Sequence, residues 1–234
     1  MKILALDTAA SFCAAALYDS DKALVLAQRR ENIGKGHAEV LMAYVDEVLA
    51  EAKLDFHQID RVAVNVGPGS FTGVRIAVSS ARGFALALKK TAIGVSAFEA
   101  LCVQAQENKS GHPVLVLLDA HRGEIFAQSF DDNGEPETNA LALTLEEAVA
   151  LSAGKPDHVL TGSAAPAVSQ ALGESRVIAQ TEPTADIAVY AKIAASKQVD
   201  EAPKPLYLRG PDAKPQVGFA LPRKAEAEQD EQAS

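Results

Sequence analysis

Residues 62–75 read VAVNVGPGSFTGVR, and this stretch decides the fold class. Its first five residues are apolar except Asn65 and predict a buried β-strand. A glycine-rich loop over residues 67–73 follows the strand, and apolar residues at helical spacing predict a helix over about 72–89. Proteins bind phosphate where such a loop opens a helix, because backbone N–H groups are free there. The stretch indicates an α/β protein and marks a candidate anion site.

The glycine spacing leaves two interpretations of this loop open. The loop has the form G-x-G-x-x-x-G with Pro68 inside, which matches neither the dinucleotide-binding motif nor the P-loop. It can be a tight turn that brings the helix close to the sheet, or it can be a weak anion site. If the loop is an anion site, the carboxylate and the hydroxyl at the end of the first strand contribute to it. The candidate contact residues are then Asp7, Thr8, Gly69, Ser70, Thr72 and Arg75.

Regular patterns extend on both sides of this stretch. Upstream, a helical pattern covers residues 37–52, and three apolar runs before it predict an antiparallel meander over 3–6, 12–18 and 23–28. Downstream, a strand–helix pair and a polar joint precede a buried strand and its hairpin partner; these segments are predicted over 92–95, 97–107, 108–113, 114–119 and 123–130. Both halves therefore open with a strand, an acidic residue and a second strand, which indicates a duplicated fold.

These patterns divide the chain into three parts. An N-terminal subdomain is predicted over residues 1–107, and a smaller second subdomain, with weaker strand and helix patterns, over 108–213. Residues 214–234 are predicted to be a disordered tail, because the last dozen residues are polar and contain no branched or aromatic apolar side chain.

Composition narrows the classes of function. The chain has 234 residues, 48% of them hydrophobic, and a formal net charge of −9, so tight binding of nucleic acid by the chain alone is not expected.

Two isolated cysteines, Cys13 and Cys102, predict free buried thiols. The first apolar run stops at Asp7, too early for a signal peptide, and no apolar run is long enough to span a membrane. We expect a soluble cytoplasmic protein with no metal site, since His37 has Leu41, not a second histidine, four residues later.

Two of the predicted helices have more apolar surface than one core contact needs. In helix 72–89, small residues recur every fourth position, which lets another helix approach closely. This helix can be a core helix or a protein contact, and the several apolar faces of helix 37–52 favour the contact. The predicted interface residues are Val40, Leu41, Tyr44, Val45, Val48, Gly73, Ala77, Ala81 and Ala85.

Four stretches occur together in a specific order. They are ILALDT at residues 3–8, GPGSFTGVRI at 67–76, DAHRGE at 119–124 and PLYLR at 205–209. With these stretches the chain resembles the TsaB (YeaZ) family over about residues 2–210. The resemblance implies an ASKHA fold (actin-like ATPase, ribonuclease H-like), in which two related subdomains have mixed sheets flanked by helices.

The resemblance also implies a function and partners. The family takes part in forming N6-threonylcarbamoyladenosine at position 37 of tRNAs that read ANN codons, as a non-catalytic subunit. Its implied partners are the catalytic TsaD subunit and the small ATPase TsaE, with a homodimer in isolation and tRNA bound only through the complex. ATP and Mg²⁺ are implied for the complex, and no cofactor for this chain alone. No catalytic residue is assigned, and no glycine follows Asp7 closely, whereas phosphotransferases of this fold have one there.

Two other functions stay open on the sequence. The chain could be an active ASKHA enzyme, such as an ATPase, a sugar kinase or a metallopeptidase-like protein, in which case it would turn over ATP or hold a metal. It could also be an unrelated anion-binding α/β domain, with phosphate at residues 69–74.

Overall fold

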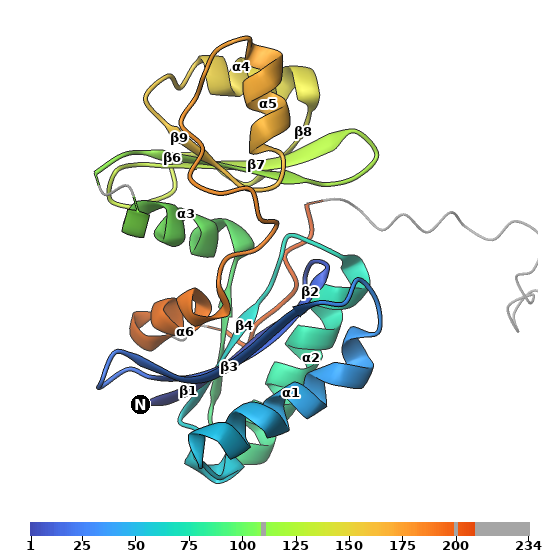
Figure 1. The fold of residues 1–234 in the computed structure, drawn as a ribbon, viewed down its shortest axis with the longest axis vertical. Helices are drawn as coiled ribbons and strands as arrows, with labels where there is room; N and C mark the ends of the chain where they lie inside the picture. The colour runs from blue at the N-terminus through green and yellow to red at the C-terminus, as the bar shows by residue number, and fades with distance from the viewer. Residues whose placement is uncertain (109–110, 199–200, 209–234) are drawn as a thin grey trace, which may run out of the picture.

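The computed structural model describes residues 1–108, 111–198 and 201–208 of the chain. It has two lobes, each built on one mixed β-sheet with helices beside it (Figure 1). The predicted tail, 214–234, lies outside the described residues. No helix in the described part is long and apolar enough to cross a membrane.

The first sheet has the strand order β3-β2-β1-β4-β5. Strands β1 to β3 form the predicted antiparallel meander, and β4 and β5 continue the sheet in parallel with β1. The strand bounds are β1 Lys2–Asp7, β2 Phe12–Asp19, β3 Leu24–Asn32, β4 Arg61–Asn65 and β5 Thr91–Val95. The predicted strands of this half are thereby confirmed.

Helices cover both faces of this sheet. Alternate side chains of β1 point to opposite faces, so Leu4 and Leu6 belong to one core cluster and Ile3 and Ala5 to another. On the Leu4 face lie α1 (His37–Ala52) and α2 (Phe71–Leu88), with the short 3₁₀ helix η1 (Phe56–Gln58) between them in sequence. On the Ile3 face lie α3 (Ala97–Asn108) and α6 (Ile187–Ser196). The helices predicted over 37–52, 72–89 and 97–107 are confirmed.

The second sheet repeats the order of the first without its last strand. Its order is β8-β7-β6-β9, in which β6 pairs antiparallel with β7 and parallel with β9, as β1 does with β2 and β4. The elements of this lobe are β6 Val114–Asp119, β7 Glu124–Phe130, β8 Leu141–Thr144, α4 Leu145–Ala153, β9 Val159–Thr161 and α5 Ala165–Leu172. The predicted duplication is therefore present in the strand order.

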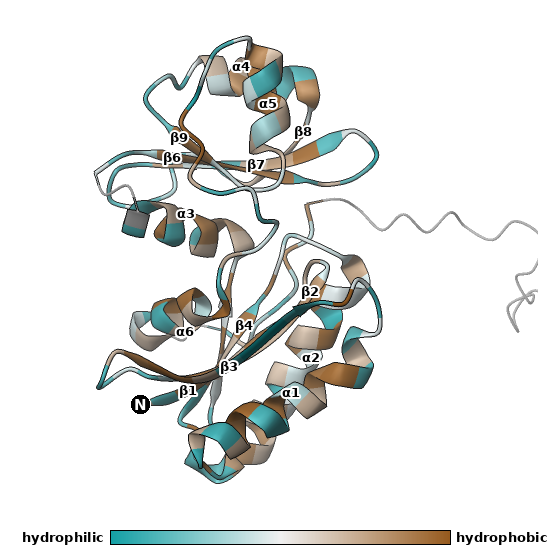
Figure 2. Cartoon of the chain, in the orientation of Figure 1, coloured by the Kyte–Doolittle hydropathy of each residue, from teal (hydrophilic) through white to brown (hydrophobic). Residues whose placement is uncertain are grey.

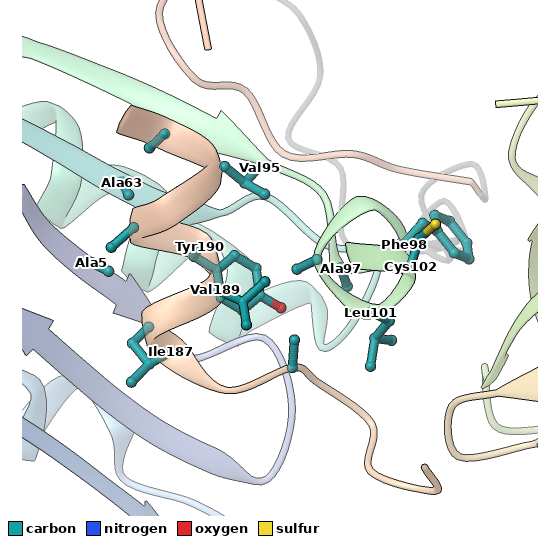
Figure 3. Close-up of a cluster of buried hydrophobic side chains, with 14 of the residues drawn as sticks. Ala5, Ala63, Val95, Ala97, Phe98, Leu101, Cys102, Ile187, Val189 and Tyr190 are labelled. Carbon is teal, nitrogen blue, oxygen red and sulfur yellow. The ribbon is translucent and has the colours of Figure 1, made fainter. Parts of the chain in front are cut away.

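One core connects the two lobes. Helix α3 packs against β6 of the second sheet and against α6 (Figure 1). Helix α6 follows the second lobe in sequence but packs on the first sheet, where Ile187 and Tyr190 lie over Ala5 and Ala63 (Figure 3). The sequence prediction placed residues 187–196 in the second subdomain, because a helix pattern does not reveal which sheet it covers.

Hydropathy follows these layers. The strands are mostly hydrophobic where they are buried, and the outer surfaces of the helices alternate between hydrophilic and hydrophobic colours (Figure 2). Cys13 and Cys102 are both buried and free, as predicted, and burial raises the pKa of each thiol to about 12.

Candidate functional site

The glycine-rich loop lies against the turn that joins β1 to β2. A Cβ atom on Gly69 would be 2.2 Å from the carbonyl oxygen of Ala9, and a Cβ on Gly73 would be 1.9 Å from that of Thr8. Both distances are far below van der Waals contact, so only glycine fits at these positions. The loop is therefore the tight turn that brings the helix close to the sheet, and the neighbour of both glycines is the backbone of the β1–β2 turn.

The chain itself uses several of the polar groups at the start of α2. The Ser70 N–H donates to the Ala9 carbonyl at 2.7 Å, and the Ser70 side chain caps the helix by accepting from the Gly73 N–H. The Thr8 hydroxyl donates to the Gly73 carbonyl at 2.6 Å. The Ala9 carbonyl therefore takes the N–H of the residue that caps α2, and the Thr8 carbonyl lies against Gly73 in the first turn of the helix.

Asp7 is the centre of a buried hydrogen-bond network at the end of β1. Its carboxylate accepts from the Ala9 N–H at 2.8 Å, from the Asn65 amide at 3.0 Å and from the Thr184 hydroxyl. The Tyr190 hydroxyl completes the network through Asn65 at 3.0 Å and Thr184 at 2.8 Å. Elements from three distant parts of the chain thus meet on one carboxylate.

Burial controls the ionisation of this network. Removal from water raises the pKa of Asp7, although the hydrogen bonds from Thr184, Ala9 and Asn65 oppose the increase. Burial also raises the pKa of Tyr190, and the neighbouring Asp7 charge adds to that increase. Because each Asp7 oxygen is already hydrogen-bonded to the chain, the carboxylate is a structural centre in this conformation.

The other two predicted anion contacts are exposed, as Gly69 and Ser70 are, but they do not contact the β1–β2 turn in the described bonds. Thr72 is exposed in the first turn of α2. Arg75 is also exposed: its guanidinium stacks on the Phe71 ring at 3.6 Å and donates from Nε to the Tyr207 hydroxyl at 2.7 Å. Arg75 therefore joins an exposed aromatic cluster, and among the described contacts none links it to Asp7. The structure brings Asp7, Thr8, Gly69 and Ser70 together and leaves Thr72 and Arg75 outside.

The structure corrects the predicted interface residues. Of the nine, eight are buried within the core of this chain, and only Val40 is partly exposed. The small residues of α2 face inward because α2 packs closely on β4, β5 and β1. The large apolar side chains that are exposed on the two helices are Met42, Phe71 and Leu86.

Sequence reasoning missed the partners of Asp7 and Arg75. Thr184 lies just before α6 and Tyr190 lies in its first turn, and no local pattern connects them with Asp7. Tyr207 belongs to the PLYLR stretch, which was a usable signal because its backbone neighbour Leu206 bonds to Val66 beside the loop. Within the described residues, no group of three or more histidine, cysteine, aspartate or glutamate side chains is placed to hold a metal ion.

The sequence of this chain is similar to those of known proteins. Residues 29–198 match the model of the TsaD family, described as tRNA N6-adenosine threonylcarbamoyltransferase. A tRNA threonylcarbamoyladenosine biosynthesis protein, TsaB of Escherichia coli (strain K12), is 32% identical over 136 residues, or 57% of this chain and 58% of that protein. The TsaB protein of Haemophilus influenzae is 34% identical over 54% of this chain and 52% of its own length. This chain thus spans little more than half the length of these curated relatives.

Other matches extend over nearly the whole chain. An uncharacterized protein of Mycobacterium tuberculosis is 32% identical over 91% of this chain and 94% of its own length. The structure of YeaZ from Pseudomonas aeruginosa is 25% identical, with a TM-score of 0.70 over 83% of this chain and 92% of that one. A second P. aeruginosa structure, described as similar to peptidase YEAZ, is 25% identical, with a TM-score of 0.74 over 89% of this chain and 99% of that one.

The repeated strand order, with a carboxylate at the end of the first strand in each lobe, defines an α/β protein of the actin-like ATPase (ASKHA) fold. The chain belongs to the TsaB (YeaZ) family.

Proposed function

We propose that this chain is a non-catalytic subunit in the formation of N6-threonylcarbamoyladenosine on tRNA, and that it binds a TsaD-type catalytic subunit. The names of the TsaB relatives support the pathway, and the match to the TsaD family model supports a fold related to that of the proposed partner. A TsaE-type ATPase and the tRNA join through the complex, in the cytoplasm, and the isolated chain forms a homodimer. ATP and Mg²⁺ act at the level of the complex.

The observation that carries the non-catalytic role is the closed glycine loop. The carbonyl oxygens of Thr8 and Ala9 lie against the loop, and the Ala9 carbonyl accepts from the Ser70 N–H at the start of α2. The N–H groups of Ser70 and Gly73, which a phosphate would need as donors, are already bonded to the Ala9 carbonyl and to the Ser70 hydroxyl. The Asp7 carboxylate is likewise held by hydrogen bonds within the chain.

The outer surfaces of α1 and α2 are the proposed contact with the partner. The exposed side chains there are Met42 (42% exposed), Phe71 (49%) and Leu86 (81%), which are large apolar groups on helices of the same sheet face. Large apolar groups that stay exposed on two neighbouring helices can mark an interaction site. The partner would therefore cover these side chains, and the buried small residues would support the helices from below.

The test mixes the purified full chain with a TsaD-type subunit and measures binding by calorimetry. We expect Met42→Glu and Phe71→Glu to weaken binding strongly while the chain stays folded by circular dichroism. The control is Leu145→Glu in α4, where an equally exposed leucine (41%) lies on the other lobe. Unchanged binding in both helix variants would contradict the contact.

An activity assay addresses the alternative, an active enzyme of this fold. The full chain alone is incubated with ATP and Mg²⁺. Turnover of about 1 per second or more, near the low end of ordinary enzyme rates, would overturn the non-catalytic role.

A further inference from the structure

A groove of about 510 Å³ lies beside the C-terminal half of α2. It runs between this helix, the start of the edge strand β5 and the segment that follows α6. Small residues keep it open, because Gly83, Ala85, Ala92 and Ala202 line it where larger side chains would fill the space. Its volume lies within the range of about 300–1,000 Å³ that is usual for sites that bind small molecules.

The buried residues of the lining are apolar. Ala85 and Ala92 are 8% and 7% exposed, and Pro203 is also buried. Leu86, which lines the groove as well, is 81% exposed. An apolar group that enters the groove would therefore remove apolar surface from water, which favours binding.

The charged residues of the lining are both basic. They are Arg82 and Lys90, and both are exposed. Lys90 pairs only loosely with Asp60, at 3.7 Å, and the same carboxylate also accepts from the Lys2 N–H at 2.8 Å. These two cations give the groove a local positive charge on a chain whose formal net charge is −9.

A carboxylate that lies close to the groove is already paired. Glu201 precedes the lining residue Ala202, and its side chain forms an ion pair with Lys204. An acid that enters the groove would therefore meet the free donors of a guanidinium and an ammonium group. A guanidinium can donate two parallel hydrogen bonds to a carboxylate or a phosphate, and an ammonium group adds a second positive charge.

We propose that this groove binds a small organic acid, with an apolar body between α2 and Pro203 and a carboxylate or phosphate head group at Arg82 and Lys90. The occupant is a small molecule because the hollow has the volume of a compound with one or two rings. A stable protein interface, by comparison, needs about 800 Å² from each partner.

Binding of the acid does not rest on the proposed function, but one consequence does. Leu86 lines the groove and also belongs to the proposed contact with a TsaD-type subunit, so an occupied groove would change part of that contact surface. The experiment uses the full chain without a partner. A failure of acid binding and a failure of partner binding are therefore distinguishable.

Three probes with the same naphthalene body test the head group. 2-Naphthoate and 2-naphthyl phosphate carry an acid, whereas 2-naphthamide is neutral. The chain has no tryptophan, so the fluorescence anisotropy of each probe can be followed at wavelengths that the protein does not absorb. We expect both acids to bind and the amide to bind about tenfold more weakly, because it lacks the charge-assisted hydrogen bonds. The acid that binds more tightly identifies the preferred head group.

Two substitutions locate the site. Arg82→Gln should weaken binding of the acids about tenfold and leave binding of the amide unchanged. Gly83→Leu should abolish binding of all three probes, because the new side chain fills the groove, and the chain should stay folded because a Cβ at this exposed residue has open space. Ala87→Leu, exposed on the same helix outside the lining, is the control and should bind the probes as the unsubstituted chain does. Circular dichroism checks the fold of each variant.

Three results would overturn the proposal. Equal affinity for the acids and the amide would show that the groove does not select an acid. Unchanged binding in Gly83→Leu would place the probes elsewhere on the chain. Failure of both acids to bind at millimolar concentration would show that the groove is not a site for them.

Discussion

Asp7 and Asp119 each accept a hydrogen bond from the backbone N–H two residues farther along, and both distances are 2.8 Å. Each ends the first strand of its sheet and opens the turn to an antiparallel partner. The two carboxylates differ in environment: Thr184 and Tyr190 cover Asp7, whereas Asp119 is exposed. The duplicated fold thus keeps the turn in both lobes and buries the carboxylate in only one.

The glycines of α2 allow a matched test of close approach. Gly73→Ala should lower the free energy of unfolding by about 1–3 kcal/mol, because the added Cβ would overlap the Thr8 carbonyl oxygen. Gly83→Ala, in the same helix with open space around it, should raise it by about 0.5–1 kcal/mol. Urea unfolding measures both changes. Equal effects of the two substitutions would show that the loop does not require a glycine at residue 73.

The burial of Ala81 in α2 predicts that a carboxylate at this position destabilises the chain, which a carboxylate at a surface position would not do. Ala81 has no exposed surface, so Ala81→Glu would bury a charge and add volume in the core. We expect the variant to lose about 3 kcal/mol or more of stability, or to unfold. Ala87→Glu, at an exposed position of the same helix, should stay folded. Circular dichroism with thermal melting decides, and a folded, stable Ala81→Glu chain would contradict the core placement.

Local pattern was sufficient to predict the elements of the first lobe. The strand 62–66 and the helix 37–52 have strong periodicity, and the structure has β4 at Arg61–Asn65 and α1 at His37–Ala52. The same pattern could not decide which way a helix faces. The alanines of α2 suit close packing against a partner or against the sheet of the same chain. The structure shows the second case, because α2 packs on β4 and β1.

The site was predictable only where its residues are neighbours in sequence. Gly69, Ser70 and Gly73 lie in one motif, and the meeting of this motif with Thr8 follows from the parallel pairing of β1 and β4. Thr184 is 177 residues from Asp7, and a single sequence carries no information about that contact. Arg75 was assigned to an anion because it lies in the first turn of a helix, but Phe71 and Tyr207 hold it outside.

In the second lobe, Glu137 should contribute to acid sensitivity. Its carboxylate accepts from Lys155 at 2.7 Å and from His158 at 2.8 Å, and these bonds lower its pKa from 4.5 to about 2. The folded chain therefore releases this proton more readily than the unfolded chain. The resulting stability is present above pH 4.5 and is lost as the pH falls towards 2. Glu137→Gln should flatten the pH dependence in this window, whereas Glu146→Gln, an exposed change in α4, should leave it unchanged.

Asp7 should act in the opposite direction. Burial raises its pKa above 3.8, so the folded chain holds this proton more tightly than the unfolded chain does. The contribution to stability is complete below pH 3.8 and is lost as the pH rises through the folded-state pKa. Asp7→Asn keeps the shape of the side chain and can still accept from the Ala9 N–H and the Asn65 amide, while its own amide can donate to Thr184. We therefore expect the variant to stay folded and to lose this pH dependence.

Urea unfolding of both chains from pH 7 to pH 3 measures the difference in free energy. That difference should shift in favour of the unsubstituted chain as the pH falls, and a difference independent of pH would show that Asp7 is not the buried titrating group.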